Sequence, residues 1–158
     1  MKTFLDAGVL LTAWRGKDAE AALMVMEDPQ REFYTSSLVK LELLPKPAFF
    51  GQKTEIEFYQ IHFQAVKGEE PLSRELGEKA GELARQYGLA AMDALHLAAA
   101  IRQGAKEFIT TEKPGKPMFR VRGIAVKSIH THNRLDRTKH GLPSNARDER
   151  HHPVGKHQ

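Results

Sequence analysis

Short strand-like segments alternate with longer segments of helical periodicity along most of the chain. Four apolar segments predict strands, at residues 2–5, 32–35, 107–110 and 123–129. Between them, apolar residues recur every three or four positions, which predicts helices. Successive parallel strands must be joined by a crossover, and a helix normally forms it. The alternation therefore predicts an α/β fold with a mainly parallel central sheet.

Residues that favour helix ends mark the borders of the helical segments. Ser36 or Ser37 can cap a helix that runs to residue 44, because a serine hydroxyl accepts a free backbone N–H of the first turn. Pro45 and Pro47 are expected to end that helix, since proline cannot continue one. Gly88 is expected to end a later helix in the left-handed conformation. The predicted helices cover residues 9–14, 18–26, 36–44, 54–66, 73–87 and 91–103.

The last part of the chain, residues 130–158, shows no periodicity and differs in composition. It contains six Lys/Arg against three Asp/Glu, and six of the eight histidines. Such a polar segment buries too little apolar surface to offset its ordering entropy. We therefore predict one domain over residues 1–129, followed by a disordered, basic, histidine-rich tail. Because +3 of the net charge of +4 lies in this tail, net charge says little about the domain.

The composition excludes several classes of protein. The chain has no cysteine, which rules out a disulfide framework, a thiolate zinc site and a cysteine nucleophile. It also lacks the glycine-rich loop that cradles phosphates. The first residues lack the apolar stretch of a signal peptide, and no segment approaches the roughly 18 apolar residues of a membrane span. We therefore expect a cytoplasmic protein that does not associate with membranes.

Four acidic residues stand where an acid interrupts or ends an apolar segment. Asp6 and Glu112 follow predicted strands, and ligands of α/β proteins gather at the carboxyl ends of strands. Asp93 lies in the apolar helix 91–103, where an unpaired carboxylate would be costly and a cation would be a suitable partner. Glu42 lies on a helix face shared with apolar residues. Singly, each could be a helix cap or a solvated acid; together they predict a site for Mg²⁺ or Mn²⁺.

At these residues the sequence resembles the PIN-domain family, which includes VapC-like toxin ribonucleases. The most specific segment is 89–105, which contains Asp93 and is followed by Phe108-Ile109-Thr110-Thr111-Glu112. Phe4-Leu5-Asp6 and segment 36–44 are similar to the first and second acidic motifs of the family. The resemblance extends from about residue 2 to residue 129. It implies a three-layer α/β/α sandwich.

The resemblance also implies a function. It assigns Asp6, Glu42, Asp93 and Glu112 as the acids that bind Mg²⁺ or Mn²⁺, and gives Thr110 the role of orienting a water or an acid. The implied activity is endonucleolytic hydrolysis of RNA phosphodiester bonds. The implied biological role is that of the toxin of a type II toxin–antitoxin pair. Its expected partners are RNA, a cognate antitoxin and a second copy of the chain.

Two departures from the family pattern leave a second function open. Ala7 and Gly8 follow Asp6, where the family commonly has threonine and asparagine. Glu112 stands where aspartate is more common, which moves the carboxylate by about the length of one C–C bond, a shift that preorganised sites feel. These changes could abolish catalysis. The alternative is therefore a catalytically silent PIN module that binds RNA or a protein.

Basic residues lie near the first and fourth acids and are candidates for contacts with the RNA backbone. Phe119, in the segment after the fourth acid, could stack on a base. The alternative is a solvated loop with one anchored aromatic residue. The weakly predicted RNA-binding residues are Arg15, Lys113, Lys116 and Arg120.

A histidine, His96, lies three residues after Asp93 in the apolar helix. Histidine often acts as a general base, and its position near a predicted site acid invites that role. Its apolar surroundings instead favour a core histidine that is hydrogen-bonded to a neighbour. We therefore leave it out of the predicted site.

Overall fold

The computed structural model describes residues 1–130, and the predicted tail beyond its first residue, His130, lies outside the described residues. Its centre is a sheet of parallel strands in the order β3-β2-β1-β4-β5. The predicted parallel sheet is therefore confirmed, and four of the strands lie within two residues of their predicted positions. The strands are β1 (Lys2–Leu5), β2 (Glu32–Ser36), β3 (Gly68–Glu70), β4 (Glu107–Thr110) and β5 (Ala125–Ser128).

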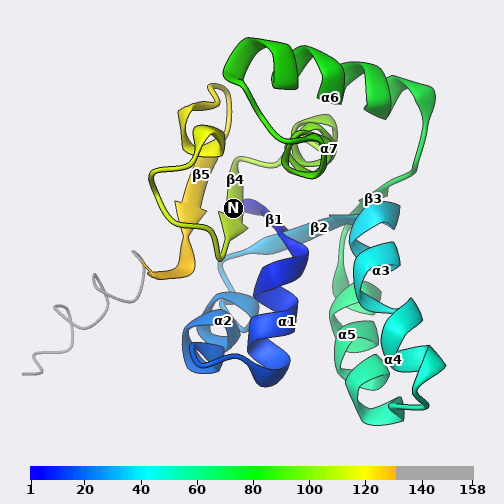
Figure 1. The fold of residues 1–158 in the computed structure, drawn as a ribbon. Helices are drawn as coiled ribbons and strands as arrows, with labels where there is room; N and C mark the ends of the chain where they lie inside the picture. Colours follow the sequence, from blue (N-terminus) through cyan, green and yellow to red (C-terminus); the bar gives the residue numbers. More distant parts are fainter. Residues whose placement is uncertain (131–158) are drawn as a thin grey trace, which may run out of the picture.

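Helices cover both faces of the sheet. Figure 1 shows α7, with α6 outside it, on one face and α1, α2 and α5 on the other. This is the predicted three-layer α/β/α arrangement. Within residues 1–130, no helix combines the length and the hydropathy that a membrane crossing requires. The helices are α1 (Ala7–Arg15), α2 (Ala19–Met26), α3 (Ser37–Leu43), α4 (Pro45–Phe49), α5 (Lys53–Ala65), α6 (Arg74–Tyr87), α7 (Ala91–Arg102) and the short 3-10 helix η1 (Pro117–Arg120).

Side-chain caps set the borders of two helices. The Ser36 hydroxyl accepts the backbone N–H of Val39 at 3.1 Å, so Ser36 rather than Ser37 caps α3. The Ser73 hydroxyl caps α6 in the same way. Gly88 ends α6 with a φ of 69°, a conformation that side chains other than glycine rarely adopt. These local signals fall at the predicted positions.

The expectation that Pro45 and Pro47 end the helix capped by Ser36 is confirmed, but a short helix that was not predicted follows it. Helix α3 does stop at Leu43, but Pro45 then opens the short helix α4. Proline is well suited to the first position of a helix, because the N–H that it lacks would have no intrahelical partner there. The two prolines therefore mark a change of direction between two helices.

Strand β3 was not predicted, because its sequence Gly-Glu-Glu has no strand-like character. It forms at the edge of the sheet by pairing with β2. The buried carboxylate of Glu70 ties it to the end of α7, where Arg102 donates to Oε1 and Gln103 donates to Oε2 at 2.8 Å. Contacts distant in sequence therefore create this strand.

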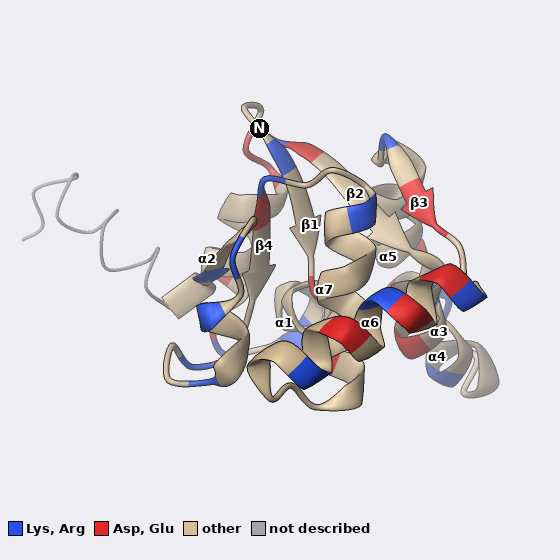
Figure 2. Cartoon of the chain, turned by 90° about the horizontal axis from the view of Figure 1, so that it is seen from above, with Lys and Arg blue, Asp and Glu red and all other residues tan. Residues whose placement is uncertain are grey.

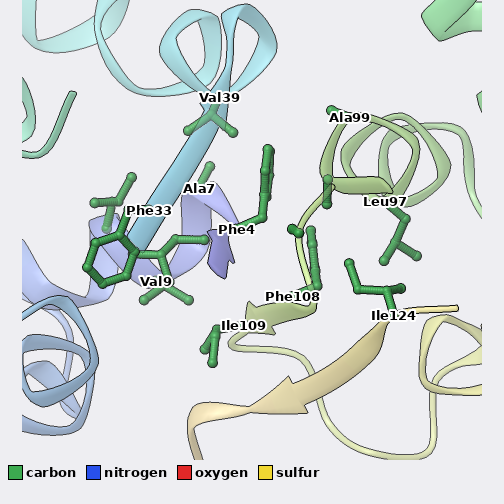
Figure 3. Packing of buried hydrophobic residues seen from close by; sticks show 14 of the residues in the cluster. Phe4, Ala7, Val9, Phe33, Val39, Leu97, Ala99, Phe108, Ile109 and Ile124 are labelled. Carbon is green, nitrogen blue, oxygen red and sulfur yellow. The ribbon is translucent and has the colours of Figure 1, made fainter. Parts of the chain in front are cut away.

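The core lies on both sides of β1 and β4. Phe4 and Phe108 are register partners on these strands, and their rings stack 5.7 Å apart on the α7 side. Figure 3 shows this pair, with Leu97 of α7 on its side of the sheet and Phe33 on the other. The packing holds the carboxyl ends of β1 and β4 next to each other. That placement matters for the site.

A buried histidine on α5, His62, makes stability dependent on pH. It packs against Phe33, and no partner for its Nε2 exists among the described residues. Burial lowers the pKa of His62 to about 4. The unfolded chain takes up this proton below about pH 6.5, so folded-state stability is complete above that pH and falls as the pH approaches 4.

We therefore expect His62→Leu to flatten the pH dependence of unfolding. Between pH 8 and pH 5, the wild-type protein should lose about 2 kcal/mol more than the variant, from about 1.4 kcal/mol per pH unit below 6.5. Urea unfolding at the two pH values measures this difference. Equal losses in both proteins would show that His62 is not the responsible group.

Candidate functional site

The candidate site lies where the connections of the sheet diverge. From β1 the chain proceeds to β2 on one side, while β4 flanks β1 on the other side. Such a switch point leaves a crevice at the carboxyl ends of the two central strands, where ligands bind in α/β proteins. Asp6 follows β1 directly, and its backbone N–H donates to the carbonyl oxygen of Ile109 in β4 at 2.9 Å. The first predicted acid is therefore at this crevice.

Thr110, the last residue of β4, connects two of the predicted acids. It is fully buried, and its hydroxyl donates to Oδ2 of Asp6 at 2.9 Å. The same hydroxyl oxygen accepts the backbone N–H of Glu112 at 3.2 Å. Donor and acceptor capacity of this hydroxyl are thus both used. Thr110 holds the Asp6 carboxylate and the start of the Glu112 segment in one arrangement.

Glu42, on α3, is held by His96 of α7. The Nε2 atom of His96 lies 2.8 Å from Oε1 of Glu42 and 4.0 Å from Oδ1 of Asp6. The buried Nδ1 has no partner in the described part of the chain. A hydrogen on Nε2 fits the contact with Glu42, because a carboxylate oxygen accepts hydrogen bonds and has no hydrogen of its own to donate. His96 therefore donates to Glu42.

The expectation of a hydrogen-bonded core histidine is confirmed for His96, but its partner is one of the four predicted acids. Sequence reasoning therefore missed a component of the site. A signal was available, because residues three apart in a helix lie on the same face. Because Asp93 was predicted to face the metal site, His96 should also have been expected near that site.

Asp93 lies in the first turn of α7 but does not cap it. Ala90 occupies the cap position, and no side-chain cap is formed there. Burial raises the pKa of Asp93, and the negative charges of Glu112 and Glu42 raise it further, against the opposing effects of Lys116 and His96. The capping explanation for this acid is wrong. Asp93 instead lies within electrostatic range of the second and fourth acids.

Asp6 experiences a similar environment. Burial raises the pKa of its carboxyl, and the charge of Glu42 adds to this, while His96 and the Thr110 hydrogen bond oppose it. Carboxylates that disfavour one another's charge in a partly buried site are stabilised by a cation. Oxygen donors of this kind suit Mg²⁺ or Mn²⁺. The donor chemistry therefore fits such an ion.

The acids are not arranged as a finished ligand shell. Among residues 1–130, no three His, Asp or Glu side chains converge as a group that could hold an ion. Two of the acids have other partners, since Glu42 contacts His96 and Glu112 forms an ion pair with Lys116 at 2.8 Å. Ion binding would require at least some of these side chains to reorient.

The space beside Gly8 is filled by another residue. A Cβ atom added to Gly8 would lie 2.7 Å from the hydroxyl oxygen of Thr111. Thr111, in the segment after β4, therefore occupies the space that a side chain at position 8 would need. Ala7 is buried and offers no polar group. The first acid is consequently supported by Thr110 and the backbone of Ala7.

The predicted RNA-binding residues lie at two flanks of the acids. Lys116 reaches Glu112, and Lys113 and Arg120 are exposed in the same segment. Arg15, at the end of α1, lines a pocket together with Glu42 on the other flank. By contrast, Figure 2 shows acidic and basic residues interspersed along α6, which therefore does not present a uniformly basic surface.

Residues 3–113 match the sequence profile of the PIN domain family. A comparison with curated proteins gives no match.

Several solved structures share the fold. VapBC-1 from nontypeable Haemophilus influenzae aligns with a TM-score of 0.61 at 18% identity, over 82% of this chain and 99% of that one. VapBC2 from Rickettsia felis, bound to a promoter DNA fragment, gives 0.59 at 17% identity, over 81% and 98%. VapC20 from Mycobacterium tuberculosis, a Sarcin-Ricin loop cleaving toxin, gives 0.56 at 18% identity, over 78% and 96%. At these identities the similarity concerns the fold.

Proposed function

The chain belongs to the PIN domain family, and from this premise we propose that it is a metal-dependent endoribonuclease, the toxin of a type II toxin–antitoxin pair. The observation that carries the proposal is that the predicted acids lie within hydrogen-bonding or electrostatic range of one another or of a shared neighbour near the switch point of the sheet. Thr110 bonds Asp6, and His96 bonds Glu42 and approaches Asp6. The negative charges of Glu112 and Glu42 raise the pKa of Asp93. These contacts and charge effects link carboxylates from four separate segments, which supports a shared site for a cation.

These four acids are the residues that would hold Mg²⁺ or Mn²⁺. When bound, the ion would activate water and neutralise charge on the phosphate that is attacked. The protein would contribute fixed positions for the carboxylates, because Thr110 restrains Asp6 and His96 restrains Glu42. Lys116 would leave Glu112 to contact a phosphate oxygen of RNA. Lys113, Arg120 and Arg15 would follow the RNA backbone on either side of the cut.

We propose an antitoxin and a second copy of the chain as protein partners. Relatives of the same fold were solved as toxin–antitoxin complexes, which supports the first. Apolar side chains on three successive helices support the second, because exposed apolar patches commonly mark interfaces. These side chains are Leu41, Phe49 and Ile61. Measurement of the solution mass by light scattering should give about twice the chain mass of 17.8 kDa.

Cleavage of an end-labelled RNA pool tests the activity. We expect purified, antitoxin-free protein to cut RNA in Mn²⁺ or Mg²⁺, and expect EDTA to abolish cutting, because the carboxylates alone cannot neutralise the phosphate. A folded protein that cuts RNA in neither metal would contradict the proposal. The positions of the cuts would then begin to define the target.

The second candidate is a catalytically silent PIN module that binds RNA or a protein. The ion pair of Glu112 with Lys116 favours it, because Lys116 competes with a metal ion for this carboxylate. The missing polar side chains at Ala7 and Gly8 favour it as well. RNA binding in EDTA, without cleavage in any divalent metal, would identify this function.

His96 provides a test of the site that does not depend on turnover. We expect His96→Leu to weaken Mn²⁺ binding by roughly tenfold or more, as is usual when a group that orients a metal ligand is lost. His96→Gln should retain most of the affinity, because its amide can donate to Glu42. Calorimetric titration of Mn²⁺ measures both, and His62→Leu serves as a buried-histidine control. Equal losses in the two His96 variants would contradict a positioning role.

A further inference from the structure

Beside Glu42, helices α1, α3, α4 and α5 enclose a pocket of about 350 Å³. This volume lies at the lower end of the range for small-ligand sites. Figure 1 shows these helices grouped at one end of the molecule. The pocket shares Glu42 with the acid cluster, so whatever binds in it lies next to the proposed cleavage site. The lining residues that matter below are Arg15, Lys46, Phe50, Glu55 and Tyr59.

The pocket contains a carboxylate in a fixed orientation. Glu55 is only 5% exposed, and the Tyr59 hydroxyl donates to its Oε2 at 2.7 Å. Burial, together with the hydrogen bond and charge of Glu55, raises the pKa of Tyr59, so that this hydroxyl remains a donor. Within residues 1–130, no donor reaches Oε1 of Glu55. A ligand in the pocket would therefore meet an oriented and unused acceptor.

Cationic and aromatic groups accompany this carboxylate. Arg15 and Lys46 line the pocket, and neither forms an ion pair with a carboxylate in the described part of the chain. Phe50 is an exposed aromatic ring at the same pocket. An acceptor for a base edge, cations for phosphate and a ring for stacking are the features by which proteins hold single-stranded nucleotides.

We propose that this pocket binds a guanine nucleotide of the RNA substrate, next to the phosphate that is cut. The inference deepens the proposed function and rests on it. Among the four bases, guanine alone presents two adjacent donors, N1–H and the N2 amino group, which match the two oxygens of a carboxylate. Oε2 can still accept one of them, because a carboxylate oxygen accepts two hydrogen bonds. Adenine would instead place its N1 lone pair against Glu55.

A peptide partner fits this pocket less well. An arginine side chain could also donate to Glu55, but Arg15 and Lys46 would repel its charge. A nucleotide carries its donors on a neutral base and its negative charge on the phosphate. It can therefore satisfy the carboxylate and both cations at once.

Nucleotide binding can be measured without cleavage. Calorimetric titration of the full chain in EDTA would compare guanosine, inosine and adenosine 5′-monophosphates. We expect the guanine nucleotide to bind about tenfold more tightly than the adenine nucleotide, from one bidentate contact. Inosine monophosphate, which lacks the N2 amino group, should fall between them.

Variants separate the contributions of the pocket. Glu55→Gln should lose the preference for guanine, while its amide oxygen can still accept the Tyr59 hydroxyl and preserve the fold. Glu57→Gln, on the exposed surface of the same helix, is the matched control. Phe50→Leu should weaken binding of all three nucleotides, because it removes the aromatic ring that lines the pocket.

Two results would overturn the proposal. One is equal affinity for the guanine and adenine nucleotides, and the other is a preference that survives Glu55→Gln. Binding of an arginine-containing peptide in place of any nucleotide would equally overturn it and assign the pocket to a protein partner. Metal-dependent cleavage with no guanine preference in these titrations would leave the proposed function standing and refute this inference alone.

Discussion

Asp93→Asn is expected to abolish metal-dependent RNA cleavage, with a loss on the order of 10²- to 10³-fold or more, the scale for removal of a preorganised charge-stabilising group. The substitution keeps the shape of the side chain and removes its charge. Asp93 lies in the first turn of α7 and makes no capping contact, so the helix does not depend on it. The expected loss therefore concerns the site and not the fold.

Thermal unfolding distinguishes these two causes. Burial and the charges of Glu112 and Glu42 raise the pKa of Asp93, which means that its ionised form is disfavoured in the metal-free protein. Asp93→Asn should consequently unfold at an equal or higher temperature than the wild type in EDTA. It should also lose the stabilisation that Mn²⁺ confers on the wild type. Mn²⁺ raises the free energy of unfolding only if it binds the folded protein, and the variant is expected not to bind it.

A matched variant completes this test. Glu82→Gln removes one negative charge from an exposed position of α6. The ion-pair partner of Glu82 is Lys79 on the same helix, and not a residue of the acid cluster. It should keep both the cleavage activity and the Mn²⁺-induced stabilisation. Full cleavage by Asp93→Asn would refute the assignment of the metal site.

Glu107→Gln is expected to produce the largest loss of stability, about 3 kcal/mol at pH 7, comparable to breaking other buried ion pairs. Glu107 is 1% exposed at the start of β4. Its Oε1 accepts from Thr3 and Arg31, both at 2.6 Å, and its Oε2 accepts from Lys127 at 2.7 Å. Removing the negative charge would leave the largely buried Arg31 without its central partner. Urea unfolding of both proteins measures the loss.

The stability conferred by Glu107 should also disappear in acid. Burial alone would raise its pKa, but the hydrogen bonds from Lys127, Thr3 and Arg31 outweigh this and lower the pKa from 4.5 to about 2. A carboxyl group with a lowered folded-state pKa stabilises the protein above its unfolded pKa. This contribution is lost as the pH falls through the folded-state value.

The difference between wild type and Glu107→Gln should therefore shrink between about pH 4.5 and pH 2. At pH 3, roughly 2 kcal/mol of it should be gone, from 1.4 kcal/mol per pH unit. A difference that stays constant over this range would show that packing, and not charge, accounts for the loss. Mn²⁺ binding by the variant should be retained, because Glu107 begins the strand whose opposite end carries Thr110.

Most of the fold was predictable because its helices and strands are marked by residues within or next to them in the sequence. Serine caps, a C-terminal glycine and regular apolar spacing marked α3, α6 and α7 within a few residues. Alternation of these helices with apolar strands required a parallel sheet. The same logic placed Asp6 and Glu112 at strand ends, where a sheet of this kind gathers its ligands.

The exceptions depend on residues that lie far apart in the chain. The Gly-Glu-Glu sequence of β3 becomes a strand only because β2 offers it an edge and because Arg102 and Gln103 satisfy Glu70. The reach of Thr111 over Gly8 likewise depends on the packing of β4 beside β1. Neither contact could be predicted from the composition of the neighbouring sequence.

For the site, the sequence by itself determined which acids are available and at which strand and helix ends they stand. Periodicity and chain breakers carry that information, because they act over a few neighbouring residues. Only the tertiary structure decided that His96 holds Glu42 and that Glu55 faces a pocket beside it. The physical reason is that a polar side chain in an apolar segment needs a partner, but its sequence neighbours do not say which segment supplies it.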